Sequence, residues 1–410
     1  MEGVGSQHVD FVSAEGEPRY SHPPVAVAFV GSHAARGGSE RVLERLIAQL
    51  GPAWVDRVVV LAAGPAVDPL RALGVPVEVL PTGTRAGLLT AAWRLRRRLL
   101  ARPPAVVHAN GVKAALVAAL ALAGTGVPVV WLKHDFSWDG PLARLIAAGC
   151  AEVTGVSAAV LACLGGGRPR GLRRPRLAVV FNGVPAYGGD PEGARAALAE
   201  ELALAASAPV IALVGRLHPA KGQLELLEAA PAVWDRHPRA HLVLAGDEDA
   251  SQSAYADRVR RAAAALGQRV HLLGYREDAG DLVAAADVLA VPSVPDERGM
   301  GREGFGLAAV EAMAAGTPVV GFDGGALPEV LGDAAVLVEA GDSAALAGAI
   351  ADLLGDEARR RALAERGRKR HARHYRPEVT AAAMAERYRL AARARPVRRR
   401  SRRARPPARR

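Results

Sequence analysis

Short apolar runs alternate with longer amphipathic stretches along most of the chain. Six apolar runs predict strands in the first half: 25–30, 57–62, 105–108, 127–133, 152–156 and 177–181. Three stretches with helical spacing of apolar positions predict helices: 39–50, 87–101 and 113–122. Because most of these strands are apolar without alternation, we expect a parallel sheet covered by helices on both faces.

The pattern restarts near residue 209. It predicts strands at 209–214, 240–245, 269–273, 288–291, 318–321 and 335–338, and a helix at 223–236. The fold class is therefore α/β, with two doubly wound, Rossmann-like domains facing a central cleft. Ligands of such sheets bind outside the carboxyl ends of the strands, so informative residues should directly follow strands.

The chain divides into five parts on this pattern. They are a disordered lead (1–24), a first domain (25–185), a second domain (186–376), a helix (377–392) and a disordered Arg-rich tail (393–410). The tail holds ten of the basic residues and no acidic one, and without it 43 basic residues face 42 acidic ones. The net charge of +11 is therefore mainly a property of the tail.

Composition excludes several classes of protein. Two cysteines, Cys150 and Cys163, make neither a disulfide framework nor a zinc ligand set, which favours a reducing, cytoplasmic location. The longest apolar run, 114–123, is about half of what a bilayer requires. The first 24 residues lack the apolar segment of a secretory signal.

A glycine pair follows the first predicted strand. Gly37 and Gly38 open a helix whose free amides suit an anion, and Ser39 is a plausible N-cap. The GxGxxG spacing of dinucleotide-binding proteins is absent. A merely flexible turn is the alternative interpretation.

A second motif follows the first strand of the second half. Arg216 and Lys221 lie five residues apart, beside glycines, at a strand-to-helix turn. They form a candidate cationic clamp for phosphate oxygens, since Arg offers a fork and Lys a point charge. The GK[ST] sequence of an NTPase P-loop is missing, and a solvated basic turn is the alternative.

Two glutamates flank a third glycine-rich turn. Glu303 lies in the turn and Glu311 in the helix that begins near Leu307, so both can point into one pocket. Carboxylates accept hydrogen bonds from vicinal sugar hydroxyls, and the amides of Gly306 and Leu307 favour phosphate.

These motifs resemble the retaining glycosyltransferases of family 4, which have the GT-B fold. The matching segments are 38–41, 156–157, 182–184, 215–222, 286–293 and 303–319. The similarity covers roughly residues 25–392, and it rests on the order and spacing of the motifs. It implies that the helix 377–392 crosses back from the second domain onto the first.

The resemblance also implies roles for individual residues. Arg216 and Lys221 would hold the diphosphate of a nucleotide sugar, together with the backbone of Gly37, Gly38, Gly306 and Leu307. Glu311 would bind the ribose, Glu303 would contact the transferred sugar, and Tyr275 and Arg276 would meet the base. His134 would lie near the reacting sugar, with Arg216, Lys221 and Glu303 as the other catalytic residues.

The acceptor side is less well defined. Family members commonly have His-x-His where this chain has His108 and Asn110, so the resemblance implies that these two lie on the acceptor side. The alternative interpretation places His108 at the edge of the core. The charged segment 294–303 either shapes the donor-sugar pocket or is a variable surface loop.

The implied reaction needs a UDP- or GDP-linked sugar as donor, no cofactor and no metal. Asp247 and Asp249 resemble a metal-binding Asp-x-Asp of another glycosyltransferase fold, but no neighbouring His or Cys completes a site, which favours a solvated turn. The acceptor is a glycan, a lipid or a small molecule. No specific nucleic-acid partner is expected, because the tail arginines have no interleaved aromatic residues.

Two further questions stay open at this point. The basic stretch 85–102 is either an ordinary crossover helix or a peripheral contact with the anionic inner face of a membrane, to which the tail would add. The alternative functions are a sugar-nucleotide epimerase or phosphorylase on a related fold, and a protein that binds nucleic acid or an anionic surface through its tail.

Overall fold

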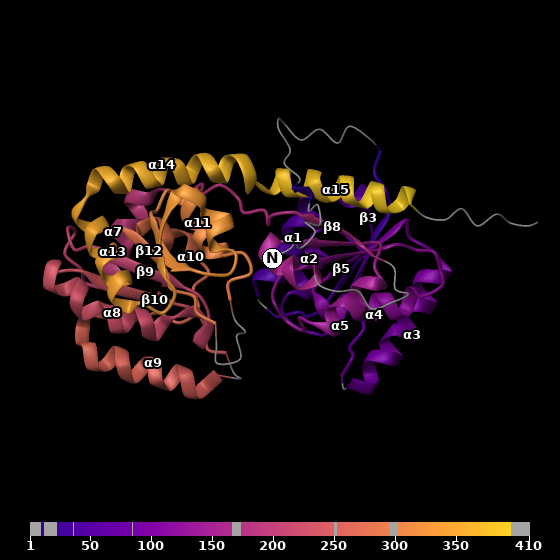
Figure 1. Cartoon of the computed structure of the whole chain (residues 1–410), viewed down its shortest axis with the longest axis horizontal. Helices are drawn as coiled ribbons and strands as arrows, with labels where there is room; N and C mark the ends of the chain where they lie inside the picture. The colour runs from indigo at the N-terminus through magenta and orange to yellow at the C-terminus, as the bar shows by residue number, and fades with distance from the viewer. Residues whose placement is uncertain are drawn as a thin grey trace, which may run out of the picture.

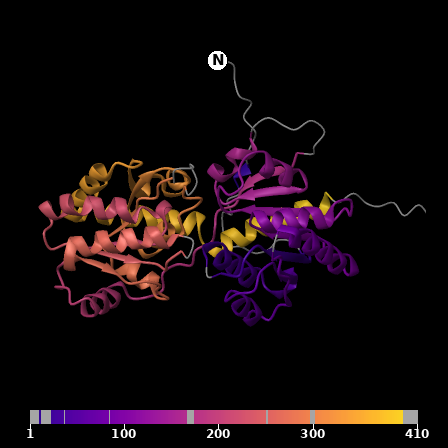
Figure 2. The same ribbon diagram turned by 90° about the horizontal axis from the view of Figure 1, so that it is seen from below.

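Two α/β domains lie side by side in the computed structural model (Figures 1 and 2). It describes residues 10–11, 23–35, 37–83, 85–165, 174–249, 252–295 and 302–394. The predicted lead and Arg-rich tail fall mostly outside these ranges, as do residues 296–301 of the charged segment. Within the lead, Asp10–Phe11 forms a short strand, β1, that the sequence pattern did not predict.

The first domain contains a parallel sheet in the order β1-β8-β7-β6-β5-β2-β3-β4. Its other strands are β2 (Val27–Gly31), β3 (Val55–Val60), β4 (Val77–Val79), β5 (Val106–Asn110), β6 (Val129–Lys133), β7 (Glu152–Gly155) and β8 (Arg176–Val179). Its helices are α1 (Gly38–Leu50), α2 (Val67–Ala72), α3 (Arg85–Ala101), α4 (Val112–Leu122), α5 (Pro141–Ala148) and α6 (Ala158–Leu161). All five residues of β2, of β5 and of β6 are buried, because helices cover both faces of the sheet.

The second domain contains a parallel sheet in the order β11-β10-β9-β12-β13-β14. Its strands are β9 (Val210–Val214), β10 (His241–Ala245), β11 (Val270–Leu272), β12 (Val288–Val291), β13 (Val319–Asp323) and β14 (Ala335–Glu339). Its helices are α7 (Pro191–Glu201), α8 (Gln223–Arg236), α9 (Ser253–Leu266), α10 (Ala279–Ala285), α11 (Leu307–Ala315), α12 (Leu327–Leu331), α13 (Ser343–Gly355) and α14 (Glu357–His374). The predicted fold of two doubly wound domains is confirmed.

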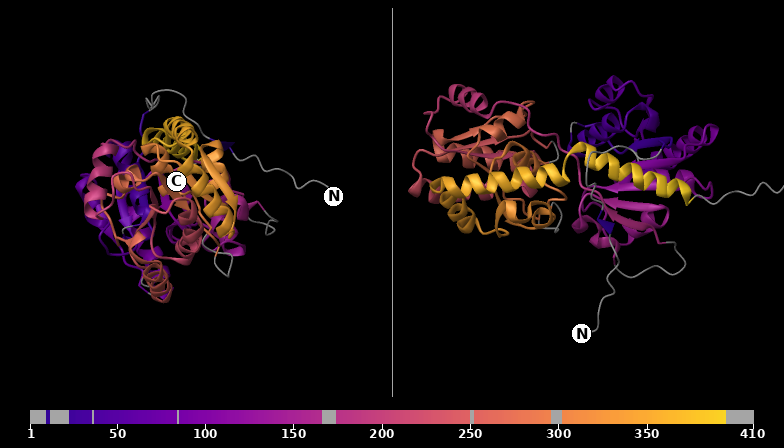
Figure 3. Two further views of the ribbon diagram at one scale, coloured as in Figure 1. Left: turned by 90° about the vertical axis from the view of Figure 1, so that its left-hand side faces the viewer. Right: turned by 90° about the horizontal axis from the view of Figure 1, so that it is seen from above.

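Helix α15 (Pro377–Arg393) leaves the second domain and packs on the first. Together α14 and α15 run across both domains (Figure 3). Pro377 occupies the first position of α15, where the backbone N–H that proline lacks would have no partner within the helix. Because a residue that precedes proline disfavours the helical conformation, α14 and α15 are separate helices. The Tyr388 hydroxyl lies 2.8 Å from His108 Nδ1, and the buried Arg387 pairs with the buried Glu152 on β7. The predicted return of this helix to the first domain is confirmed.

One hydrophobic cluster joins the two domains. It contains Leu132, Phe136 and Val160 from the first domain together with Ala309 and Leu327 from the second. Polar contacts reinforce it, since the Ser157 hydroxyl donates to the Gly304 carbonyl at 2.8 Å and Glu329 accepts from the Ala158 amide at 2.9 Å. The carboxyl ends of the two sheets are therefore held close together at a defined interface.

Candidate functional site

A cleft of about 410 Å³ lies between the domains and is lined by residues of both. Gly37 and Gly38 enter it after β2, and His134 directly after β6. From the second domain come the turn after β9, Ser293 after β12, and the turn that precedes α11. The lining residues therefore follow strands, as the topology of parallel sheets requires.

The amino-terminal ends of α1 and α11 meet at this cleft. Gly38 begins α1 and Leu307 begins α11, and a Cβ atom at Gly38 would lie only 2.7 Å from Leu307 Cδ1. Gly306, the N-cap of α11, has a φ of +89°, which a glycine adopts without strain. Because the first amides of both helices lack partners within the helix, the two ends favour an anion between them.

Lys221 and Glu303 form an ion pair inside the cleft. The Lys221 ammonium lies 2.7 Å from Glu303 Oε2, which also accepts from the Ser293 hydroxyl at 3.1 Å. Glu303 Oε1 accepts from the Gly306 amide at 3.2 Å. Burial alone would raise the pKa of Glu303, but the Lys221 charge and these hydrogen bonds outweigh it and hold the pKa below its usual value. Glu303 is therefore a carboxylate at neutral pH.

Arg216 is also paired in this structure. Its guanidinium donates to Asp249 Oδ2 at 2.7 Å while the side chain stays 63% exposed. The buried side-chain amide of Gln223 donates to the Arg216 carbonyl at 2.8 Å and thereby fixes the backbone of this turn. Within the described ranges no group of three or more His, Cys, Asp and Glu side chains is arranged to hold a metal ion. Asp249 acts here as a counter-ion of the predicted clamp.

Glu311 lines the cleft one helical turn inside α11 and faces the first domain. Its Oε1 lies 3.7 Å from Arg45 Nη2 on α1. Burial lowers the pKa of Arg45, although the charge of Glu311 opposes this shift. Glu311, which was predicted to bind the ribose, therefore faces the Arg45 guanidinium across the domain boundary, a partner that the sequence did not indicate.

A hydrogen-bonded chain orients His134. Asn110 Nδ2 donates to the Ser39 carbonyl at 3.2 Å, which leaves Asn110 Oδ1 to accept from His134 Nε2 at 2.7 Å. Burial lowers the pKa of His134 to about 4, with the charge of Asp135 opposing the shift and that of Lys133 adding to it. His134 is thus neutral at physiological pH, with its proton on Nε2.

The structure does not bring His108 to the cleft. Its side chain is fully buried beside Phe29 and Tyr388, under the returning helix α15. Burial lowers the pKa of His108 to about 3. The expectation that His108 contacts the acceptor is corrected by this placement, and Asn110 contacts two cleft-lining residues, Ser39 and His134.

Tyr275 and Arg276 also lie outside the lining of the cleft. Arg276 forms ion pairs with Glu201 at 2.5 Å and with Asp278 at 2.6 Å, and Tyr275 is about half exposed. The hydrogen bonds to these carboxylates raise the pKa of Arg276 and lower that of Asp278. Their contact with a base stays a prediction.

Several cleft residues were not assigned a role from the sequence, among them four with polar or charged side chains. Arg41, Asp135, Ser293 and Arg302 line the cleft. The Arg302 guanidinium lies 5.2 Å above the ring of Phe136, which places a cation of the second domain against the first. Ser293 lies two residues after the end of β12, which was an available signal, whereas the position of Arg302 depends on domain packing.

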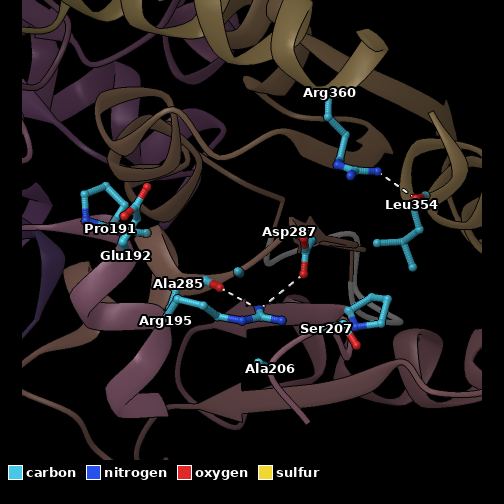
Figure 4. A pocket seen from close by; sticks show the side chains of 12 residues that line it. Pro191, Glu192, Arg195, Ala206, Ser207, Ala285, Asp287, Leu354 and Arg360 are labelled. Atoms are coloured by element: carbon cyan, nitrogen blue, oxygen red, sulfur yellow. Dashed lines mark hydrogen bonds and ion pairs between the residues drawn. The ribbon is translucent and has the colours of Figure 1, made fainter. Parts of the chain in front are cut away.

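A second cavity, of about 610 Å³, lies on the second domain (Figure 4). It opens at the amino-terminal edge of the sheet, next to Asp287 before β12 and Pro209 before β9. Arg195 donates to the Ala285 carbonyl at 2.9 Å and to Asp287 at 3.2 Å. The polar groups that line this cavity hydrogen-bond to one another. The cavity lies away from the carboxyl-terminal edge of the sheet, where the sequence motifs are located.

Comparison with known protein families agrees with the resemblance in the sequence. Residues 36–186 match the family described as Glycosyltransferase Family 4, and residues 208–356 match the family described as Glycosyl transferases group 1. Together the two matches cover well over half of the chain, one in each domain.

Two curated relatives are similar over part of their length. A GDP-mannose-dependent monoacylated alpha-(1-6)-phosphatidylinositol monomannoside mannosyltransferase of Corynebacterium glutamicum is 35% identical, over 42% of this chain and 45% of its own. A D-inositol 3-phosphate glycosyltransferase of the same species is 35% identical, over 52% of this chain and 51% of its own. The chain spans about half the length of these relatives.

A solved structure extends the similarity to nearly the whole chain. The structure of HepE of Anabaena in complex with UDP-glucose is 25% identical and superimposes with a TM-score of 0.75, over 89% of this chain and 99% of that one. The fold of nearly the whole chain is thus similar to that of a protein whose structure was solved with UDP-glucose.

Proposed function

Because the chain belongs to glycosyltransferase family 4, we propose that its interdomain cleft transfers a sugar from a nucleotide-diphosphate sugar to an acceptor hydroxyl. One observation carries this proposal: two helix amino termini, the Lys221–Glu303 pair and Glu311 line a single cleft. The set combines partners for a diphosphate with carboxylates for sugar hydroxyls.

Lys221 and Arg216 bind the donor diphosphate in this proposal. Both already carry a carboxylate partner, Glu303 and Asp249, so the donor competes with these two ion pairs. When Lys221 turns to the diphosphate, Glu303 becomes free to accept hydrogen bonds from the transferred sugar. The amides at the starts of α1 and α11 complete the neutralisation of the leaving group.

Glu311 binds the ribose after exchanging Arg45 for two hydroxyl groups. The 3.7 Å separation from Arg45 is longer than a hydrogen bond, so this exchange breaks a weak contact and forms stronger ones. Neutral His134 faces the reacting sugar from the first domain and supplies a hydrogen-bonding ring without a charge.

We further propose that the donor is UDP- or GDP-linked, and that transfer proceeds with retention of configuration. The nucleotide choice is supported by a relative named as GDP-mannose-dependent and by a structural neighbour solved with UDP-glucose. Retention is carried over from the family resemblance. Metal independence is supported by the Arg, Lys and helix-terminus groups already present around the diphosphate position.

An inositol-containing acceptor is the proposed partner. The two relatives described above are named for phosphatidylinositol monomannoside and for inositol 3-phosphate, which share the inositol ring. Helix α3 offers a peripheral contact with an anionic membrane, since Leu89, Trp93 and Leu100 are exposed on it beside several arginines. None of the described helices is both long and apolar enough to cross a bilayer. A peripheral position at the cytoplasmic face fits this proposal.

Product analysis tests the proposed function. The full chain is incubated with labelled UDP-glucose or GDP-mannose and with phosphatidylinositol or inositol phosphate, and the products are separated and analysed by NMR. We expect one donor to give an α-linked product, and activity to survive EDTA. Hydrolysis or epimerisation of every donor without transfer would contradict glycosyltransferase activity, and loss of turnover on chelation, restored by Mn²⁺, would contradict metal independence.

A further inference from the structure

The loop that connects β6 to α5, residues 134–140, is pinned at both ends by one buried cation. Lys133 is 1% exposed, and its ammonium donates to the Asp135 carbonyl and lies 2.7 Å from Asp139 Oδ1. The Asp135 carboxylate in turn accepts from the Ser137 amide at 2.8 Å. A buried ammonium is stable only when it is paired and hydrogen-bonded, so this anchoring fixes the shape of the loop.

Successive residues of this loop face different surroundings. Asp135 lines the cleft, and Phe136 is buried against the second domain under the Arg302 guanidinium. Trp138 points outward, 41% exposed, with a φ of +56°. A bulky side chain at positive φ is a strained arrangement, which persists only where the surrounding structure imposes it. The anchored loop thus maintains an exposed tryptophan close to the cleft.

Helix α5 continues the apolar surface away from the cleft. Leu142 is 43% exposed and Leu145 57% exposed, whereas Ala143, Ile146 and Ala147 of the same helix are buried. Arg144 is the one polar residue among its eight positions. A surface helix normally presents a polar face to water, so an apolar outer face indicates a partner.

We propose that Trp138, Leu142 and Leu145 form a binding site for the apolar part of the acceptor. We call these three residues the α5 stripe. Trp138 follows the cleft-lining Asp135 by three residues, so their Cα atoms lie within about 11 Å of each other. An acceptor whose hydroxyl enters the cleft beside Asp135 therefore places an attached acyl chain within reach of the stripe. The Trp138 ring and the leucine side chains bury that chain.

This inference rests on the proposed function and makes it more specific. The relatives are named for two kinds of inositol acceptor, one lipid-linked and one a free phosphate. A free inositol phosphate has no group that an apolar stripe would bind. The stripe therefore assigns this chain to acyl-bearing acceptors. The α5 stripe is separate from the exposed apolar residues of α3, because α4 packs against both helices and lies between them.

Fluorescence titration of the full chain tests the stripe. The probes are dihexanoyl phosphatidylinositol, kept monomeric, and glycerophosphoinositol, which lacks only the acyl chains. Each buried methylene contributes roughly a factor of four in affinity, so two of them predict binding of the acylated probe tighter on the order of tenfold. We expect a blue shift of tryptophan emission with the acylated probe alone.

Matched variants identify which tryptophan responds. Trp93 and Trp138 are both exposed, while Trp54, Trp131 and Trp234 are buried. The blue shift should persist in Trp93→Phe and disappear in Trp138→Phe. Leu145→Ser should weaken binding of the acylated probe several-fold and leave binding of glycerophosphoinositol unchanged, whereas Leu120→Ser, at an exposed leucine of α4, should change neither. Circular dichroism confirms that each variant is folded.

A third probe separates this inference from the proposed acceptor. Dihexanoyl phosphatidylcholine carries the same chains on another headgroup. If both lipids shift the emission of Trp138 equally, the α5 stripe is supported as an acyl-chain site and the inositol proposal is contradicted. If neither lipid shifts the emission of Trp138, or if the shift is lost in Trp93→Phe instead, the α5 stripe is refuted. This result does not depend on whether the cleft binds nucleotides.

Discussion

Removing the Lys221 ammonium should reverse the way in which Glu303 responds to pH. Lys221→Met keeps most of the length of the unbranched side chain but removes its charge, which leaves the carboxylate with the Ser293 hydroxyl and the Gly306 amide. In the native protein the pKa of Glu303 is lowered, so its contribution to stability is present above the unfolded pKa and is lost as pH falls through the folded pKa. Without Lys221, burial dominates and raises the pKa of Glu303, so that protonation at falling pH stabilises the variant.

The magnitude follows from the exposure of the pair. Lys221 is 34% and Glu303 14% exposed, which lies between a surface pair and a fully buried one. Surface pairs contribute up to about 1 kcal/mol, and breaking a buried pair costs about 3–5 kcal/mol. Discounted for the solvent that reaches Lys221, the variant should lose about 2 kcal/mol at pH 7.

Urea unfolding of four proteins measures this coupling: wild type, Lys221→Met, Glu303→Gln and the double variant, each at several pH values between about 4 and 8. The deficit of Lys221→Met relative to wild type should be largest at neutral pH and shrink as pH falls. In the Glu303→Gln background, the same lysine substitution should cost little. A deficit that stays constant with pH, or one equally large without the carboxylate, would refute this account of the pair.

Three further perturbations test separate parts of the site and fold. Glu311→Gln should weaken binding of free nucleoside diphosphate in calorimetry, whereas Glu303→Gln should spare that binding and lower turnover; equal losses of affinity would show that the two roles are wrongly assigned. Because a pKa of about 4 keeps His134 neutral, the rate should show no titration of this group between about pH 5.5 and 8, and a midpoint near 6.5 that vanishes in His134→Gln would contradict this. Ending the chain at Ala392 should leave the melting temperature unchanged. Ending it at Arg376 removes the buried Met384 and Tyr388 and should destabilise the first domain by several kcal/mol, on the order of what two large buried side chains contribute. Equal melting temperatures of the two truncated proteins would refute the structural role of α15.

The sequence predicted those elements whose pattern is local. Strands such as β6 and β12 are short, uninterrupted apolar runs because both sheet faces are covered, so their length and composition identify them. Strand β4 has only three half-buried residues, and α5 is apolar around most of its circumference, so neither shows a clear period. The fold class was therefore recoverable while short or non-amphipathic elements were not.

The candidate site was predicted to a similar extent. Glycine-rich turns after strands pointed to Lys221, Glu303 and Glu311, which the structure brings into one cleft. Their partners depend on tertiary packing, because Arg45 meets Glu311 only across the domain boundary. His108 resembled a site residue because the predicted strand ended at it, yet β5 continues to Asn110 and the returning helix α15 covers the His108 side chain. No local pattern specifies which strand-end residue another segment will cover.

Calorimetric titration of UDP and GDP into the full chain tests the central claim most directly. We predict that one of the two nucleotides binds, and that the Arg216→Ala/Lys221→Ala double variant, folded by circular dichroism, binds it at least about 100-fold more weakly because two charge-assisted contacts to the diphosphate are lost. Equal affinity of the wild type and the double variant would contradict the assignment of this cleft as the site of the donor diphosphate.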